Sequence, residues 1–291
     1  MSTNPGSGTS VKSSLWGDAL KRIVRNKAAL VGLTIVMLIV ICAIFPNKIA
    51  PYGYDDQNYQ DKFISPCLMH PMGTDNFGRD ILSRVIYGCR ISIQIGLVSV
   101  GISTVVGGLL GMLAAFYGGI LDNLIMRFLD ILLAVPNILL AIAIVASLGP
   151  GLLNLMIAVG IGSVPQYARV ARASILSIKE QEFVEAARAV GSGDLRLIFR
   201  QLLPNAAAPI IVQATLGVAG AILSAAGLSF LGLGIQPPIP EWGSMLSSGR
   251  QYIREYWWVV TFPGLTIMVV ILALNLFGDG LRDALDPRLK R

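Results

Sequence analysis

The sequence is poor in charged residues and in the side chains that bind metals. Asp, Glu, Lys and Arg make up 14% of its 291 residues, whereas hydrophobic residues make up 54%. So little charge cannot cover the surface of a water-soluble globule, so the composition indicates a membrane protein. His70 is the single histidine and there are three cysteines, whereas an ordinary zinc site needs three or four His, Cys or carboxylate ligands. We therefore expect His70 to be a loop residue and no metal to be bound.

The sequence also lacks the pattern of a cleaved signal peptide. A polar segment precedes the first apolar run and no small-residue cleavage site follows it, so this run is expected to remain as a helix. Six segments are long and apolar enough to cross a bilayer, because even 18 residues at about 1.5 Å each span about 27 Å. These segments are Ala28–Phe45, Ile91–Phe116, Ile131–Leu148, Leu152–Val170, Ala206–Leu223 and Trp258–Phe277. The sequence predicts an all-α membrane protein with six transmembrane helices.

The distribution of basic residues predicts the orientation. With both termini in the cytoplasm, 16 of the 23 Lys and Arg lie on the cytoplasmic side, if Arg169 at the end of the fourth segment is included. The positive-inside rule favours this arrangement. The net charge of +6 then reflects topology and attraction to anionic lipid headgroups, and no nucleic-acid partner is needed to explain it.

Four regions follow from these segments. We expect a cytoplasmic tail and interfacial helix over residues 1–27, a first transmembrane helix and extracytoplasmic segment over 28–90, a core transmembrane domain over 91–280 that includes a loop at about 171–205, and a cytoplasmic tail over 281–291. Cys67 and Cys89 both fall in the first outer segment, so an external disulfide between them is left open. In the second apolar segment, Gly107 and Gly111 form a GxxxG pattern that favours close helix packing.

A charged stretch interrupts the apolar sequence between the fourth and fifth segments. Apolar residues from Ile175 to Val190 follow helical spacing, which predicts an amphipathic helix outside the membrane. Gly191 is placed to end this helix, Asp194 to cap a second short one, and Pro204 to open the fifth transmembrane helix. The second short helix would direct Leu195, Ile198 and Leu202 to one face.

Two interpretations of this helical loop remain open on physical grounds. Its apolar face packs against the protein's own helix ends, which is the usual outcome in a membrane protein, or it inserts into a groove of a soluble partner.

The sequence pattern of the loop resembles that of a known family. Glu185-Ala-Ala187, Gly191 and Leu203-Pro204 match the EAA loop of permease subunits of bacterial ABC importers. The stretches His70–Ser92, Leu228–Leu246 and Phe262–Arg291 are similar to the C-type permease of the dipeptide/oligopeptide/nickel group. Gln201 departs from the pattern, which often has Ile there. The resemblance covers nearly all of the chain after about residue 15 and implies the type I ABC importer permease fold with cytoplasmic coupling helices.

The resemblance implies a function in which the chain forms half of a translocation path. The partners it implies are a homologous B-type permease, two ABC ATPase subunits and an extracytoplasmic substrate-binding protein, all at a bacterial plasma membrane. ATP and Mg²⁺ would be used by the ATPase subunits, and this chain would bind no cofactor, in agreement with its lack of a GxxxxGK[ST] loop. Peptides are the expected substrate, with nickel or another small solute as the alternative.

The resemblance also implies roles for the residues of the loop. Glu185 would be a polar anchor, Ala186 and Ala187 would keep the helix thin enough to enter a groove, and Gly191 would allow a sharp turn. The full set of coupling residues is Glu185, Ala186, Ala187, Gly191, Asp194, Leu203 and Pro204.

Three polar residues within apolar segments are candidates to line the path, because a polar side chain facing lipid is unfavourable. They are Asn137, Gln213 and Asn275, and hydrogen bonds between helices are the alternative role. Two other classes were weighed: an aspartyl protease using Asp130 and Asp279, and an ion-coupled secondary transporter. Asp279 lies among boundary charges, and the sequence shows no paired interrupted helices, so neither class is favoured.

Overall fold

The structure is a computed structural model that describes residues 23–285, and within that range it is helical without strands. The main helices are α2 (Lys27–Ile44), α4 (Ile81–Tyr117), α5 (Gly119–Ala134), α6 (Asn137–Leu148), α7 (Leu152–Lys179), α8 (Glu182–Ala189), α9 (Asp194–Arg196), α10 (Leu203–Phe230), α11 (Trp242–Gly249) and α12 (Trp258–Leu285). Short turns of helix are α3 (Pro46–Ile49), η1 (Tyr59–Asp61) and η3 (Arg250–Tyr252), and a π-helix, η2, covers Leu197–Leu202. The predicted all-α class is confirmed.

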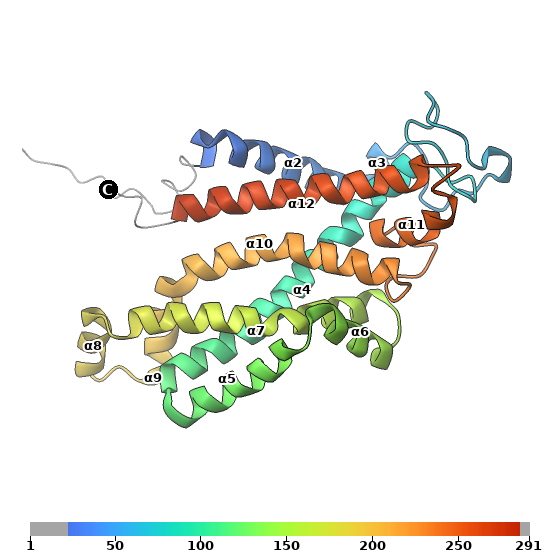
Figure 1. The fold of residues 1–291 in the computed structure, drawn as a ribbon. Helices are drawn as coiled ribbons and strands as arrows, with labels where there is room; N and C mark the ends of the chain where they lie inside the picture. Colours follow the sequence, from blue (N-terminus) through green and yellow to red (C-terminus); the bar gives the residue numbers. More distant parts are fainter. Residues whose placement is uncertain (1–22, 286–291) are drawn as a thin grey trace, which may run out of the picture.

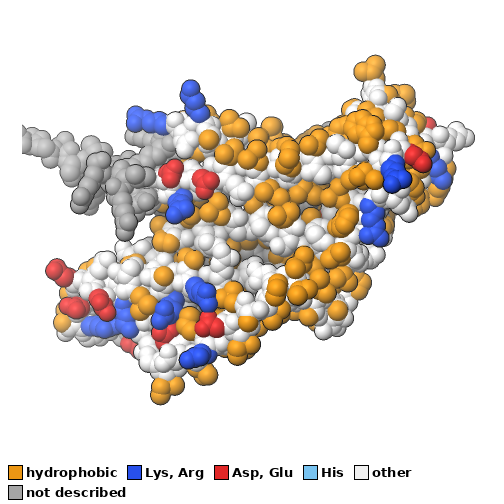
Figure 2. Space-filling model, in the orientation of Figure 1, with side chains coloured by type: hydrophobic (Ala, Val, Ile, Leu, Met, Phe, Trp, Pro, Cys, Tyr) orange, Lys and Arg blue, Asp and Glu red, His pale blue; other side chains and the backbone are white. Residues whose placement is uncertain are grey.

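Four stretches of helix are long and apolar enough to cross a membrane: α2, α4, the continuous run Asp194–Phe230 and α12. α7 is also long, at 28 residues, but it carries Arg169 and Arg172 and is not among them. Figure 1 shows α2, α12, α10 and α7 side by side, with α4 crossing them obliquely. Hydrophobic side chains cover the middle of the face shown in Figure 2, and charged ones gather toward its two ends. This distribution fits a protein surrounded by lipid at its waist.

The third predicted segment, Ile131–Leu148, is not one helix. α5 ends at Ala134 and α6 begins at Asn137, and the two are bent by 90°. Pro136 lacks an amide N–H and disfavours helical geometry at Val135, so the helix stops there. Counting this bent pair as one crossing and α7 as another gives the predicted total of six.

Close packing of α4 on α7 sets the centre of the molecule. Gly107 and Gly111 touch the backbone of Val164 and Ala168, where a Cβ atom would collide. Ser103 adds a hydrogen bond across the same pair of helices, donated to the carbonyl of Gly160 at 2.7 Å. The close approach predicted from the GxxxG pattern is therefore confirmed.

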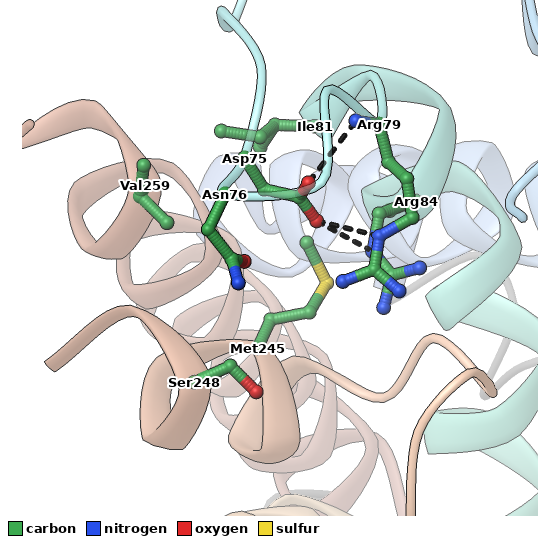
Figure 3. A pocket seen from close by; sticks show the side chains of 8 residues that line it. All are labelled: Asp75, Asn76, Arg79, Ile81, Arg84, Met245, Ser248 and Val259. Carbon is green, nitrogen blue, oxygen red and sulfur yellow. Dashed lines mark hydrogen bonds and ion pairs between the residues drawn. The ribbon is translucent and has the colours of Figure 1, made fainter. Parts of the chain in front are cut away.

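One end of the molecule, here called the α11 end, consists of residues 45–80, the start of α4, α11 and the start of α12. Buried ionic groups hold it together: Arg79 donates to Asp75 at 2.7 Å, and Arg84 approaches the same carboxylate at 3.9 Å (Figure 3). His70, a buried loop residue, bonds to Asp80 at 2.9 Å. The predicted boundary at residue 90 falls inside α4, which runs from this end through the membrane without a break.

The cysteines do not form the disulfide that was left open. Cys67 is exposed in the loop, whereas Cys89 is buried on α4, where its neighbour is Cys42 of α2. Because α4 begins at Ile81 and carries Cys89 inward, Cys67 and Cys89 point to different surroundings. Only Ile23–Arg25 of the predicted interfacial helix, and none of the tail beyond Leu285, lie within the described residues.

Candidate functional site

A polar cavity of about 140 Å³ lies between α4, α7 and α10, at the first turn of α6. Asn137 and Gln213, both predicted from sequence as path residues, line it together. The other polar side chains of its wall are Ser99, Ser103, Ser163, Gln166, Tyr167 and Ser224. None of the described residues that line it is charged. A neutral, hydrogen-bonding cavity among transmembrane helices is a candidate translocation path.

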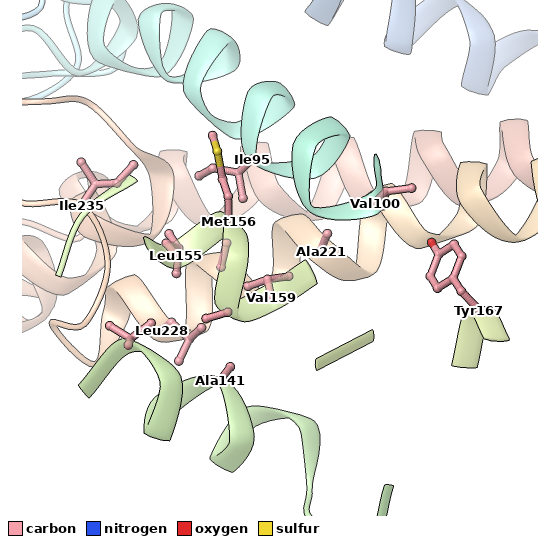
Figure 4. Packing of buried hydrophobic residues seen from close by; sticks show 13 residues of the cluster. Ile95, Val100, Ala141, Leu155, Met156, Val159, Tyr167, Ala221, Leu228 and Ile235 are labelled. Atoms are coloured by element: carbon pink, nitrogen blue, oxygen red, sulfur yellow. The ribbon is translucent and has the colours of Figure 1, made fainter. Parts of the chain in front are cut away.

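Tyr167 joins two walls of this cavity. The residue sits at the edge of the apolar cluster between α4, α6, α7 and α10 (Figure 4), and its hydroxyl donates to the backbone carbonyl of Gln213 at 3.3 Å. Gly217, one turn further along α10, lies directly under that hydroxyl, and any Cβ at Gly217 would collide with it. The glycine therefore leaves the space that the Tyr167 hydroxyl occupies against α10.

Sequence reasoning found only part of this wall. Asn275, the third predicted path residue, is exposed on α12 and does not line the cavity. Gln166 was missed although it follows Pro165 in the middle of a long helix, a signal comparable to Asn137 after Pro136. The serines carry no such signal, because small hydroxyl residues are common in transmembrane helices and bond to their own backbone.

The helical loop lies at the opposite end from α11, here called the α8 end. α7 ends at Lys179, whose ammonium group donates to the carbonyls of Ala115 and Phe116 at 3.0 and 2.7 Å. These are the last carbonyls of α4, which have no partner inside that helix and favour a cation. Lys179 thereby fixes the end of α7 on the end of α4.

The amphipathic stretch predicted over Ile175–Val190 is broken into two helices. α7 stops at Lys179 and α8 starts at Glu182, with Gln181 extended between them. The break turns α8 back onto the bundle, where Val184 and Ala187 are buried among apolar side chains of α4, α7 and η2. A single straight helix would carry these two residues away from that cluster.

The two alanines of the EAA pattern therefore face different surroundings. Ala187 is buried in the protein's own cluster, whereas Ala186 and Glu185 are exposed. One face of α8 therefore packs against the protein's own helices, and the other face is exposed and available to a partner. The proposed role of Ala187 in thinning the helix for a groove is wrong in that respect, since its methyl group faces inward.

Gly191 ends α8 as predicted. Its φ of +82° is in the left-handed region, and the amide of Ser192 donates to Ala187 while that of Gly191 donates to Arg188. This pair of bonds is the Schellman arrangement, which favours glycine because it has no Cβ.

The second part of the loop differs from its prediction. Gly193, not Asp194, is the N-cap of α9, and Asp194 is an exposed residue of its first turn. The helix then continues through η2 into α10 without interruption, so Pro204 does not open a new helix. Pro204 has no N–H to donate, and it lies where the π-type hydrogen bonds, which span five residues, give way to α-type bonds, which span four. The preceding residue, Leu203, still makes a π-type bond to the carbonyl of Ile198. The apolar face also differs from the predicted one: Leu195 is exposed, and Leu197 is buried with Ile198 and Leu202.

Two ion pairs fasten α5 to α7 near this end. Arg172 donates to both oxygens of Asp122 at 2.7 and 2.6 Å, and Arg169 donates to Asp130 at 2.6 Å. Asp130 thus serves as an ion-pair partner between helices, in place of the catalytic role weighed from sequence.

Family models match two parts of the chain. Residues 107–291, more than half of the sequence, match the binding-protein-dependent transport system inner membrane component. The chain belongs to this family of permeases. Residues 14–70 match the N-terminal transmembrane domain of oligopeptide transport permease C, in agreement with the C-type resemblance.

Individual relatives agree with this assignment. The chain is 50% identical to the dipeptide transport system permease protein DppC of Alkalihalophilus pseudofirmus, over 95% of this chain and 91% of that one. It is 53% identical to the di/tripeptide transport system permease protein DppC of Pseudomonas aeruginosa, over 91% and 89%. A chain of the inward-facing MetNI methionine ABC transporter superposes with a TM-score of 0.57 at 20% identity, covering 70% of this permease and 96% of that chain, which supports the fold.

Proposed function

We propose that this permease forms one half of the path of an ATP-driven peptide importer. The observation that carries the proposal is the connection between the cavity and the helical loop. α7 and α10 form opposite walls of the polar cavity, and α8, α9 and η2 join the same two helices at the α8 end. Any displacement of the loop is therefore passed to both walls, as alternating access requires.

The neutral lining suits peptides as the substrate. A peptide offers amide donors and acceptors and carries a charge at each end, and the side-chain amides of Asn137, Gln166 and Gln213 can donate to and accept from it. Because no fixed charge lies in the described lining, neither end of a zwitterionic peptide is held by a strong ion pair. Peptides of different net charge would then pass through one site.

The energy source lies on other subunits in this proposal. We place the α8 end in the cytoplasm, so that the exposed face of α8, with Glu185 and Ala186, docks on one of two ABC ATPases that bind ATP and Mg²⁺. The α11 end then faces the substrate-binding protein, and a homologous B-type permease supplies the other half of the path. The chain itself has no phosphate-binding loop.

The assembled transporter in proteoliposomes tests the substrate. We expect ATP-dependent uptake of labelled dialanine when the B-type permease, both ATPases and the binding protein are present. Uptake of a nickel chelate without any dialanine uptake would replace peptide by metal complex as the cargo. Uptake driven by an ion gradient without the ATPases would show a secondary transporter instead.

A pair of glycines tests whether the cavity is the path. Gly217→Ala places a methyl group against the Tyr167 hydroxyl. Overpacking of this kind costs about 1–3 kcal/mol, so we expect dialanine uptake to fall by about tenfold. Gly101→Ala is the matched control, because Gly101 is exposed on α4, has open space beside it and does not line the cavity. Tyr167→Phe should partly restore uptake to the Gly217→Ala variant. Equal losses from both glycine variants would contradict the assignment.

A further inference from the structure

An apolar groove of about 350 Å³ lies between α2 and α12, in the half of the molecule toward the α11 end. Its walls extend to Cys42 on α2 and begin at Phe262 on α12, with Cys89 of α4 between them. The hydroxyl of Thr266, the one classically polar side chain in its described lining, donates to the carbonyl of Phe262 at 2.9 Å. The groove therefore offers no unpaired polar group to a ligand, and its volume is within the range of small-molecule sites.

The groove opens onto the apolar outer surface of the chain. Leu38, Leu265 and Val269 line it and are 57%, 44% and 40% exposed. α2 has 18 residues, a length of about 27 Å, so its last residues reach the level of the lipid headgroups. A chain lying in the groove would thus run from mid-membrane to the interface.

Two cationic side chains, those of Arg90 and Lys48, lie near the end of α2, where the groove reaches the membrane interface. Arg90, next to Cys89 on α4, donates to the carbonyls of Ala43 and Ile44 at 2.8 and 3.0 Å, at the end of α2. These bonds use two of its five N–H donors and hold the exposed guanidinium beside the groove. Lys48 lies over the ring of Phe45, 5.8 Å from its centre, four residues past Ile44, the last residue of α2.

We propose that this groove is a binding site for an anionic phospholipid. One acyl chain occupies the apolar channel between α2 and α12, and the phosphate group binds Arg90 and Lys48. Apolar shape and positive charge are placed at the two depths where a phospholipid carries its chain and its headgroup. A bound lipid would fill the space between α2 and the core helices and fasten α2 to them.

Lipid retention by the purified transporter complex tests the site, with phosphatidylglycerol as the probe and native mass spectrometry as the readout. Val269→Trp fills the groove, and we expect this variant to retain one phosphatidylglycerol fewer per complex than the wild type. Met268→Trp is the matched control, because Met268 is 56% exposed on the same helix and does not line the groove. Lys48→Gln should lower the preference for phosphatidylglycerol over phosphatidylcholine by about fivefold, the effect of one cation near the surface.

Three outcomes would overturn the proposal. Equal lipid retention by Val269→Trp and Met268→Trp would show that the groove holds no lipid. Lys62→Gln, in the exposed loop, is the control for the two cations. If Lys48→Gln and Arg90→Gln both keep the headgroup preference of this control, the site does not recognise an anionic headgroup. Loss of the partner permease from the Val269→Trp complex would show that a protein helix, and not a lipid, covers the groove.

Discussion

The α11 end and the α8 end of this permease differ in the side chains that they bury and expose. At the α11 end, polar groups are buried and paired: Asp75 with Arg79, His70 with Asp80, and the indole N–H groups of Trp242 and Trp258 with backbone carbonyls at 3.1 and 3.2 Å. These contacts join residues far apart in sequence, such as Trp258 and Thr74. These buried polar groups thus find their partners within the single chain.

At the α8 end, large apolar side chains remain on the surface. Val190, Leu195 and Phe199 are 82%, 72% and 56% exposed, although charged residues surround them. An exposed apolar patch rimmed by polar residues is typical of a protein interface. The buried pairs make the α11 end a frame that positions the helices, although its loop also exposes Leu68 and Met69. The α8 end is held by apolar packing, and in the proposed function a partner completes its surface.

The largest effect is expected from removing the central carboxylate of the frame. Asp75→Ala leaves Arg79 and Arg84, both almost fully buried, without their anion, and breaking a buried pair in this way costs about 3–5 kcal/mol of stability. Thermal unfolding in detergent measures this loss. The control is Glu255→Ala at an exposed position of the same end. Equal unfolding temperatures for the two variants would show that this network does not hold the α11 end.

A smaller effect on stability is expected to distinguish the two faces of α8, at the α8 end. Ala187→Trp forces a large ring into the cluster of Val184 and Leu197, so we expect about 1–3 kcal/mol of destabilisation from overpacking. Ala186→Trp projects outward, and we expect stability within about 0.5 kcal/mol of the wild type. Its transport and stimulated ATPase activity should nevertheless fall, because the ring obstructs docking.

The two alanine variants also test the proposed docking surface. Gly191→Pro serves as a third variant, since proline cannot adopt the positive φ of that turn. Normal dialanine uptake by Ala186→Trp would show that this face of α8 meets no ATPase, whatever the stability of Ala187→Trp.

Much of the fold could be predicted because hydropathy and small-residue patterns act locally. The apolar length of α2 and α12, the close approach at Gly107 and Gly111, and the turn at Gly191 each depend on a few neighbouring residues. The EAA pattern located the helical loop and the turn at Gly191, whereas the start of its first helix and its junction with α10 were predicted wrongly.

The rest could not be predicted because it depends on tertiary contacts. The π-helix over Leu197–Leu202 could not be predicted, because helical spacing alone assumes 3.6 residues per turn, and Leu197 rather than Leu195 is buried beside Ile198. α7 also ends at Lys179, whose ammonium group binds α4 carbonyls 63 and 64 residues away, a contact that no local pattern indicates. Asn137 and Gln213 were identified as polar residues in apolar segments, but only the folded arrangement separates them from Asn275.

The smallest effect on stability is expected at Glu241, a buried acid of the frame whose hydrogen-bond partners are backbone amides and not an arginine. Glu241 accepts hydrogen bonds from the amides of Gly243 and Ser244 at 2.8 and 2.7 Å, and burial nonetheless raises its pKa above the ordinary value of 4.5. A carboxyl group whose pKa is raised by folding stabilises the folded state below the ordinary pKa, and that contribution is lost as the pH rises through the folded pKa. The Glu241→Gln variant stays neutral at every pH, so its unfolding temperature should match that of the wild type at acidic pH and exceed it at higher pH. The corresponding difference in the free energy of unfolding is expected to be roughly 1 kcal/mol or less. A variant that is less stable than the wild type above neutral pH would show that the two amide bonds outweigh the burial of charge, and that the frame needs this carboxylate as it needs Asp75.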